Sequence, residues 1–63
     1  MERELTILLI EDDQKACDEI QAYSDATDGT RIINTTNSAF EAIEMVKASL
    51  PDAVILDLEL HLG

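Results

Sequence analysis

Four acidic residues stand where apolar segments of the sequence end or break. Glu11, Asp12 and Asp13 directly follow the segment LLI, and Asp57 interrupts a second apolar segment that begins AVIL. Crowded carboxylates repel one another and lose hydration when buried, so such a set is costly unless a cation neutralises it. Oxygen ligands that are few and leave room for water suit Mg²⁺, with Mn²⁺ as the alternative. If the fold brings these positions together, they predict a divalent-cation site.

Zinc sites, EF-hands and simple capping fit the same acids less well. No histidine or cysteine stands beside them, which disfavours zinc, and their spacing is not that of an EF-hand, whose ligands fall within a loop of about 12 residues. Taken singly, Asp12 or Asp13 is explained by capping of a helix, and Asp57 by the end of a strand. The combination is what favours a shared site.

Hydrophobic periodicity and turn signals predict the elements that position these acids. The apolar runs at 5–10 and 53–56 are continuous, which is typical of strands that are covered on both faces in a parallel sheet. The segment between them has only Ile32 and Ile33 as strongly apolar residues, so we expect an edge strand there. The predicted order is strands at 5–10, 31–35 and 53–60, alternating with helices at 13–24 and 38–50.

The ends and the buried faces of the two helices can also be predicted. Ser38 and Glu41 have the spacing of a capping box at the start of the second helix, and Pro51 ends that helix. Each helix should bury one apolar stripe. The expected stripes are Ala16, Ile20 and Tyr23 in the first helix, and Ala39, Ala42, Ile43, Val46 and Leu50, together with Phe40 or Met45, in the second.

Alternating strands and helices imply a parallel sheet. Placing the weak second strand at the edge gives the strand order 2-1-3, and right-handed crossovers then put the two helices on opposite faces. This is one half of a flavodoxin-like, doubly wound α/β sheet. Ligands of such sheets bind outside the carboxyl ends of the strands, at the switch point between the first and third strands. We therefore expect Glu11, Asp12 and Asp57 to meet there, although Asp12 and Asp57 are 45 positions apart (57 − 12).

The composition limits the function classes that the chain fits. Its 63 residues make at most one domain, and its net charge of −10 argues against binding of nucleic acid through this segment. No apolar run is long enough to cross a membrane, and the start lacks the order of a signal peptide. The single cysteine, Cys17, can form no internal disulfide and is expected to be a small buried side chain. A reducing, cytoplasmic location fits these features.

Two segments resemble the receiver domain of two-component response regulators. ILLIEDD is similar to the family's first strand with its acidic pair, and LPDAVILDLEL is similar to the helix end and third strand that carry the phospho-accepting aspartate. The resemblance covers the whole chain, in the family's order and spacing. It implies a signalling module rather than an enzyme. Its implied partners are a sensor histidine kinase or phosphotransfer protein and the output domain of the parent chain.

The resemblance also implies a role for each acid. Asp57 matches the aspartate that accepts a phosphoryl group from a histidine kinase. Asp12 matches the direct ligand of Mg²⁺, and Glu11 matches its partner, which acts through metal-bound water. Asp57 itself and the backbone carbonyl of Glu59 complete the implied metal ligands. Asp13 follows the acidic pair and is better explained as the helix cap.

The chain departs from the family in two respects. His61 stands where the family usually has proline, and we expect a surface residue there rather than a catalytic base. Only three of the family's five strands are expected, so the later Ser or Thr and Lys that contact the phosphoryl group are missing. Lys15 and Lys47 fall in predicted helices, away from the strand ends. The sequence therefore predicts the amino-terminal half of a receiver, which by itself is phosphorylated little or not at all.

Two alternative functions remain open. The outer edge of the 53–60 strand is expected to be unpaired and apolar on both faces, which is an aggregation hazard. We expect that the chain does not persist as a lone monomer, and that it either belongs to a longer protein or pairs with a copy of itself. A binding or self-assembly fragment without phosphotransfer is therefore the second interpretation. A phosphatase with an aspartyl nucleophile is less favoured, since such enzymes typically have a DxD motif where this chain has Glu11, Asp12 and Asp13.

Overall fold

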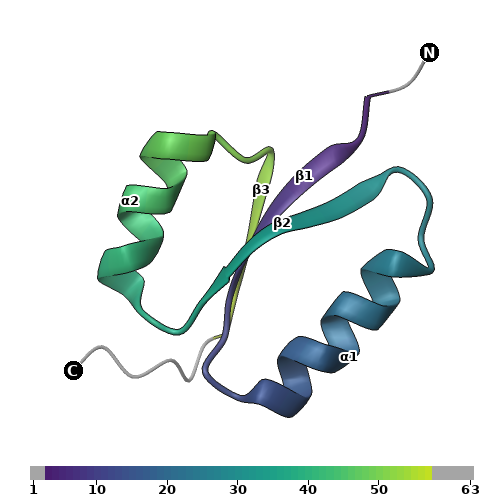
Figure 1. Ribbon diagram of the computed structural model, residues 1–63, viewed down its shortest axis with the longest axis horizontal. Helices are drawn as coiled ribbons and strands as arrows, with labels where there is room; N and C mark the ends of the chain where they lie inside the picture. The colour runs from purple at the N-terminus through teal and green to yellow at the C-terminus, as the bar shows by residue number, and fades with distance from the viewer. Residues whose placement is uncertain (1–2, 58–63) are drawn as a thin grey trace.

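The computed structural model describes residues 3–57 of the chain (Figure 1). Its elements are β1 (Leu5–Ile10), α1 (Gln14–Asp25), β2 (Thr30–Thr36), α2 (Ala39–Ser49) and β3 (Ala53–Leu56). The three strands form one parallel sheet in the order β2-β1-β3. The β-α-β-α-β order and the strand order predicted from the sequence are thus confirmed. Neither of the helices in this part of the chain is long and apolar enough to cross a membrane.

The central strand, β1, pairs with both of its neighbours. Its residues Ile7 to Ile10 lie in register with Ala53 to Leu56 of β3, and its pairing with β2 contains one register shift. The described strand β3 ends at Leu56, one residue before Asp57. Its predicted continuation over 58–60 lies outside the described residues. Both strands that carry predicted site residues therefore lie side by side and point the same way.

The two helices cover opposite faces of the sheet, as predicted (Figure 1). Successive side chains of a strand point to opposite faces. Leu8 and Ile10 accordingly form a cluster with Ala42 of α2, against which Met45 packs, whereas Ile7 lines a groove beside α1. Covered on both faces, residues Ile7 to Ile10 are each at most 8% exposed. The core therefore consists of the side chains of β1 and those that pack against them.

Capping side chains fix where each helix begins. Asp13 is the N-cap of α1, so this helix begins at Gln14, one residue later than expected. The Oγ of Ser38 accepts from the backbone N–H of Glu41, which is one half of the expected capping box. The other half is indirect, because the Glu41 carboxylate accepts from the hydroxyl of Thr36, whose oxygen in turn accepts from the N–H of Ser38. Helix α2 is thereby fastened to the end of β2.

Several apolar side chains that were expected to be buried are exposed. In α2, Ile43 is 54% and Leu50 is 77% exposed, with Val46 and Phe40 also exposed, and Tyr23 of α1 is 80% exposed. The predictions for Ile43, Val46, Leu50 and Tyr23 were therefore wrong, as was the alternative of Phe40. Met45, the other alternative, does pack against the core. The physical reason is that the described sheet is narrow: in α2 only Ala42 and Met45 pack against the buried side chains of β1, and the rest of the apolar stripe has no such cover.

Candidate metal centre

The backbones of the predicted site residues are fastened to neighbouring strands. The N–H of Glu11, which directly follows β1, donates to the carbonyl of Thr36 at the end of β2 (2.9 Å). The N–H of Asp57, which directly follows β3, donates to the carbonyl of Ile10 (3.0 Å). Each hydrogen bond continues a parallel ladder one step beyond its strand. Both acids are thus held at the carboxyl edge of the sheet.

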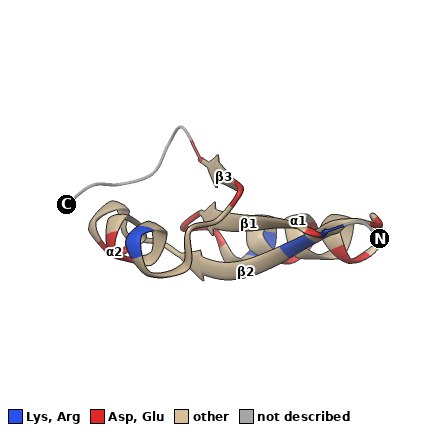
Figure 2. Ribbon diagram, turned by 90° about the horizontal axis from the view of Figure 1, so that it is seen from above, with Lys and Arg blue, Asp and Glu red and all other residues tan. Residues whose placement is uncertain are grey.

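Three of the predicted site side chains come together at this edge. Glu11, Asp12 and Asp57 each offer a carboxylate oxygen, and the three oxygens lie within 4.8 Å of one another. Glu11 and Asp57 are partly buried and Asp12 is exposed. Figure 2 shows the acidic segments at the neighbouring ends of β1 and β3. The convergence expected from the switch point of the sheet is therefore observed between residues far apart in the sequence.

The surroundings of Glu11 raise the pKa of its carboxyl group. Loss of hydration on burial, followed by a hydrogen bond to the Asp57 carboxyl and by the charge of Asp57, raises the pKa of Glu11 above its ordinary value. Backbone hydrogen bonds from Asp13 and Asp12 oppose this shift. Protonation of Glu11 is one way to relieve the repulsion between like charges. A divalent cation is the other, and an oxygen-only donor set fits Mg²⁺ or Mn²⁺.

The third acid of the run, Asp13, belongs to the helix rather than to the cluster. Its carboxylate accepts from the backbone N–H of Lys15 (3.3 Å), and its own N–H donates to the Glu11 carboxylate (3.3 Å). The cap therefore also orients Glu11. Cys17, one turn on, donates its S–H to the Glu11 carbonyl (3.7 Å). Burial first, and the charge of Glu11 second, raise the pKa of the Cys17 thiol, which keeps it protonated and unreactive.

The remaining residues singled out from the sequence lie elsewhere. Glu59, expected to offer a backbone carbonyl, and His61 fall outside the described residues. Lys47 lies on α2 and pairs with Glu44 (3.5 Å), while Lys15 lies in the first turn of α1. Both lysines are therefore helical, as the sequence predicts.

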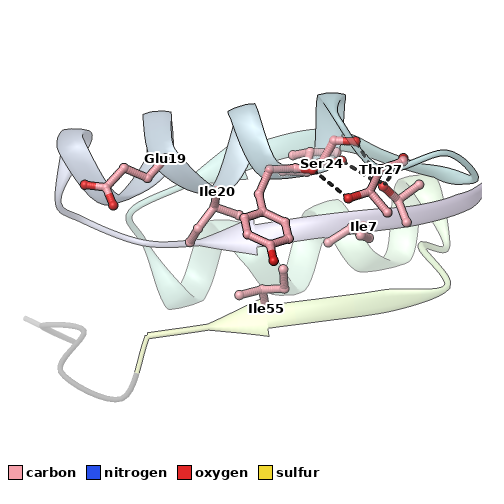
Figure 3. Close-up of a pocket in the computed structure, with 9 residues that line it drawn as sticks. Ile7, Glu19, Ile20, Ser24, Thr27 and Ile55 are labelled. Carbon is pink, nitrogen blue, oxygen red and sulfur yellow. Dashed lines mark hydrogen bonds between the residues drawn. The ribbon is translucent and has the colours of Figure 1, made fainter.

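An apolar groove lies beside α1, on the face of the sheet that carries Ile7 of β1 and Ile55 of β3 (Figure 3). It has a volume of about 440 Å³, and its apolar lining includes Ile20 and Tyr23 of α1 and Ile55 of β3. Its polar side chains include Glu19 of α1 and a pair, Ser24 and Thr30, whose hydroxyl groups are hydrogen-bonded to each other (3.1 Å). None of the three clustered carboxylates lines it. The groove is therefore separate from the acidic cluster.

Sequence reasoning missed a group of interacting residues at the opposite end of the β1–β3 pair. Asp52, directly before β3, binds Arg3 and Thr6, which lie 49 and 46 positions earlier. The available signal was that a basic residue and an acidic residue stand at the amino ends of two strands predicted to be neighbours. Because parallel strands begin at the same edge, these charges had to meet.

No family model matches the chain, and no curated protein and no solved structure matches it. Any statement of its function therefore depends on the fold and on the arrangement of side chains. The strongest such observation is the group of three carboxylates at the carboxyl ends of β1 and β3. Its position agrees with the general rule for ligand sites in open α/β sheets.

Proposed function

We propose that this chain carries the phosphoacceptor and cation-binding acids of a response-regulator receiver module in two-component signalling. The observation that carries the proposal is the approach of the Glu11, Asp12 and Asp57 carboxylates to within 4.8 Å of one another. An ordinary arrangement of caps and strand ends has no need to gather three like charges. A site for a divalent cation and a transferred phosphoryl group does need them, because the cation requires anionic oxygens.

Each residue has a distinct task in this proposal. Asp57 would be the nucleophile and a metal ligand, Asp12 would bind Mg²⁺ or Mn²⁺ directly, and Glu11 would act on the ion through water. The resemblance further implies, as a ligand, the backbone carbonyl of Glu59, which lies outside the described residues. The exposure of Asp12 suits direct contact with a partly hydrated ion, and the partial burial of Glu11 suits the indirect role. A bound cation offsets the charge that develops on the oxygens of the transferred group.

The reaction is the transfer of a phosphoryl group from a phosphohistidine. A carboxylate oxygen of Asp57 forms a bond to phosphorus, the P–N bond breaks, and its electron pair returns to the imidazole ring. Asp57 must be ionised to attack. The half-buried position of Asp57 at the sheet edge leaves it within reach of a donor, which we take to be a sensor histidine kinase or a phosphotransfer protein. Phosphorylation would then regulate an output domain of the parent protein in the cytoplasm.

Metal binding tests the cation site directly in the 63-residue chain. We expect titration with Mn²⁺, followed by water-proton relaxation, to show one site that Mg²⁺ displaces competitively. Asp12→Asn and Asp57→Asn should each weaken binding at least roughly tenfold, because each removes a ligand charge. Asp18→Asn is the matched control, since it removes the same charge from the exposed surface of α1. Equal weakening by all three substitutions would show diffuse electrostatic attraction and would contradict the proposal.

Phosphorylation tests the nucleophile. With acetyl phosphate and Mg²⁺, intact-mass measurement should show little or no adduct on the chain alone, because the family's later Ser or Thr and Lys are not among its 63 residues. A fusion that adds the family's fourth and fifth strands, with this Ser or Thr and this Lys, should gain a single adduct. Asp57→Asn should abolish that adduct. An adduct that persists in Asp57→Asn would place the phosphoryl group elsewhere. A phosphomonoester that is turned over would favour the phosphatase alternative.

A second candidate function, self-assembly, is favoured by the exposed edge of β3. The strand is the last of the sheet, and Val54, Ile55 and Leu56 are between 38% and 54% exposed. An open strand of this kind is a template for another strand. Antiparallel pairing with a second copy would put the two acidic clusters at opposite ends of the joined sheet. That arrangement reduces repulsion between chains that each carry a net charge of −10.

Size-exclusion chromatography with light scattering tests this candidate. We expect the wild-type chain to form dimers or larger species whose fraction rises with concentration. Val54→Lys should lower that fraction, because a charge on an edge strand opposes pairing. Asn37→Lys, which adds the same charge away from β3, is the control. A compact wild-type monomer at all concentrations would exclude self-assembly.

A further inference from the structure

The amino ends of β1 and β3 are joined by a network around Asp52, which we call the Asp52 clamp (Arg3, Thr6 and Asp52). The two Oδ atoms of Asp52 accept from both terminal nitrogens of Arg3, at 2.8 and 2.9 Å. Oδ2 also accepts from the backbone N–H of Thr6 (2.8 Å) and from its hydroxyl (3.0 Å). The N–H of Asp52 donates to the carbonyl (2.9 Å) and the hydroxyl oxygen (3.1 Å) of Thr6. One short side chain thus accepts four hydrogen bonds.

The clamp is unusual on this surface in being both bidentate and partly shielded. The Asp52 side chain is only 19% exposed, although that of its partner Arg3 is 76% exposed. The other ion pairs in the described part of the chain, Arg31 with Glu4 and Lys47 with Glu44, join side chains that are all more than half exposed. Bidentate, shielded pairs fix geometry far better than exposed ones.

Strand β3 has little else to fix its position along β1. It has only four residues, and three of them are substantially exposed. Register in a sheet is normally set by burial of one face, and it is weakly specified where both faces are open. The interactions that hold β3 include its ladder to β1, the clamp before Ala53, the bond from the Asp57 N–H to the Ile10 carbonyl, and the contacts of Ile55 in the apolar groove.

Register decides whether Asp57 can take part in the site. A slip of one residue would move Asp57 by about 3.3 Å along the sheet and turn its side chain to the opposite face. The carboxylate would then leave the group that it forms with Glu11 and Asp12. Because Asp52 pairs with Thr6 only in the observed register, the clamp selects the register that puts Asp57 beside Glu11.

We propose that Asp52 is a positioning residue for Asp57, acting through the register of β3 from the opposite edge of the sheet. The inference rests on the proposed function, because that function is what requires Asp57 to lie beside Glu11. The hydrogen bonds of the clamp are the means by which Asp52 would hold it there. Asp52 touches neither the acidic cluster nor any group that would bind there. Its effect on the site is exerted through five residues of backbone, from position 52 to position 57 (57 − 52).

The experiment compares Asp52→Asn with Asp28→Asn. Asp28 lies in the turn whose next residue, Gly29, accepts a hydrogen bond from Leu5 at the same edge of the sheet. The control therefore removes the same charge at a similar distance from the cluster. Asn at position 52 must turn a donor toward Arg3 or Thr6, so it breaks the clamp. We expect Asp52→Asn to weaken Mn²⁺ binding roughly tenfold, the lower end for residues that orient ligands, and Asp28→Asn to leave it unchanged within about twofold.

Amide hydrogen exchange separates positioning from general stability. Asp52→Asn should lose protection at the Asp57 N–H while the N–H of Glu11, which bonds to Thr36 of β2, keeps its protection. Thr6→Val removes only the two hydrogen bonds between the Thr6 hydroxyl and Asp52, so it should change both readouts in the same direction as Asp52→Asn but by less. Thr6→Ser, which keeps the hydroxyl, should restore both exchange and Mn²⁺ affinity. Equal loss of protection at Glu11 and Asp57 would show a merely structural role and overturn the inference.

Two further outcomes distinguish the positioning role of Asp52 from the proposed cation site. Unchanged Mn²⁺ affinity and unchanged protection in Asp52→Asn would overturn the positioning role while leaving the cation site intact. If the wild-type chain binds no Mn²⁺, the proposed function fails, and the clamp is then judged on exchange alone. In that case the inference stands only if two results hold. The Asp57 N–H must lose protection selectively in Asp52→Asn, and it must be better protected in Thr6→Ser than in Thr6→Val.

Discussion

Strands β1 and β3 have similar sequences and very different surroundings. Residues Ile7 to Ile10 are at most 8% exposed, whereas Val54 to Leu56 are at least 38% exposed, although the two segments pair residue by residue. Both strands end in acids of the proposed site. Strand β1 is fixed by apolar burial on both faces, and β3 by hydrogen bonds at its two ends. The burial of an apolar strand thus depends on the elements that cover it. A site shared by two such strands is only as rigid as the less buried strand.

The largest expected effect comes from truncating paired residues on the two strands. Leu9 and Ile55 are register partners on the same face of the sheet. Leu9→Ala should lower the free energy of unfolding by about 3 kcal/mol, because Leu9 is 1% exposed and its removal leaves a cavity. Ile55→Ala should cost about 1 kcal/mol or less, because Ile55 is already 38% exposed. Urea unfolding followed by circular dichroism gives both values, and equal costs would remove the contrast between the strands.

A divalent cation should stabilise the folded state by joining the carboxyl ends of β1 and β3. At a Mg²⁺ concentration about ten times its Kd, the folded state gains about 1.4 kcal/mol. Thermal unfolding with and without Mg²⁺ measures this gain, and hydrogen exchange should show it most strongly at Asp57. Asp12→Asn should abolish the effect and Asp18→Asn should not. Stabilisation that is the same in Asp12→Asn would place the cation elsewhere.

Lowering the pH should speed up amide hydrogen exchange in β3 before it does so in β1. We expect this effect to be smaller than those of side-chain truncation and cation binding. Arg3, through its hydrogen bonds, and then Thr6 lower the pKa of Asp52 from 3.8 to about 2. The contribution of the clamp is therefore complete above the ordinary pKa and is lost as the pH falls through the folded value. Between about pH 4 and pH 2, the exchange of the Asp57 N–H should speed up before that of β1. Asp52→Asn, which has no carboxyl at this position, should show no such pH step.

The acid at the other end of the strand pair should respond in the opposite direction. The pKa of Glu11 is raised in the folded state, so its contribution is present below its ordinary value of 4.5 and is lost as the pH rises through the folded value. Without a cation, Glu11→Gln should therefore stabilise the fold at neutral pH relative to wild type. Chemical unfolding at two pH values checks the sign. With Mg²⁺ bound the advantage of Glu11→Gln should disappear, because the cation then offsets the charge.

The order of strands and the meeting of Glu11, Asp12 and Asp57 could be predicted because both follow from chain direction and handedness. Residues at the carboxyl ends of neighbouring parallel strands must share an edge. Burial could not be predicted for Ile43 or Leu50, because periodicity identifies apolar side chains but not what covers them. The relay from Glu41 through Thr36 was missed for a related reason, since it depends on how the loop between β2 and α2 folds.

The end of α2 carries an uncommon backbone conformation. Leu50, its C-cap, has φ of 47° and ψ of 60°, the left-handed region that branched side chains seldom occupy, and its side chain is 77% exposed. Pro51 follows and excludes a longer helix. Glycine or asparagine would adopt the same turn with less strain and without presenting a large apolar group to water. This one position therefore offers a route to a more soluble and more robust version of the protein that leaves the acidic edge untouched.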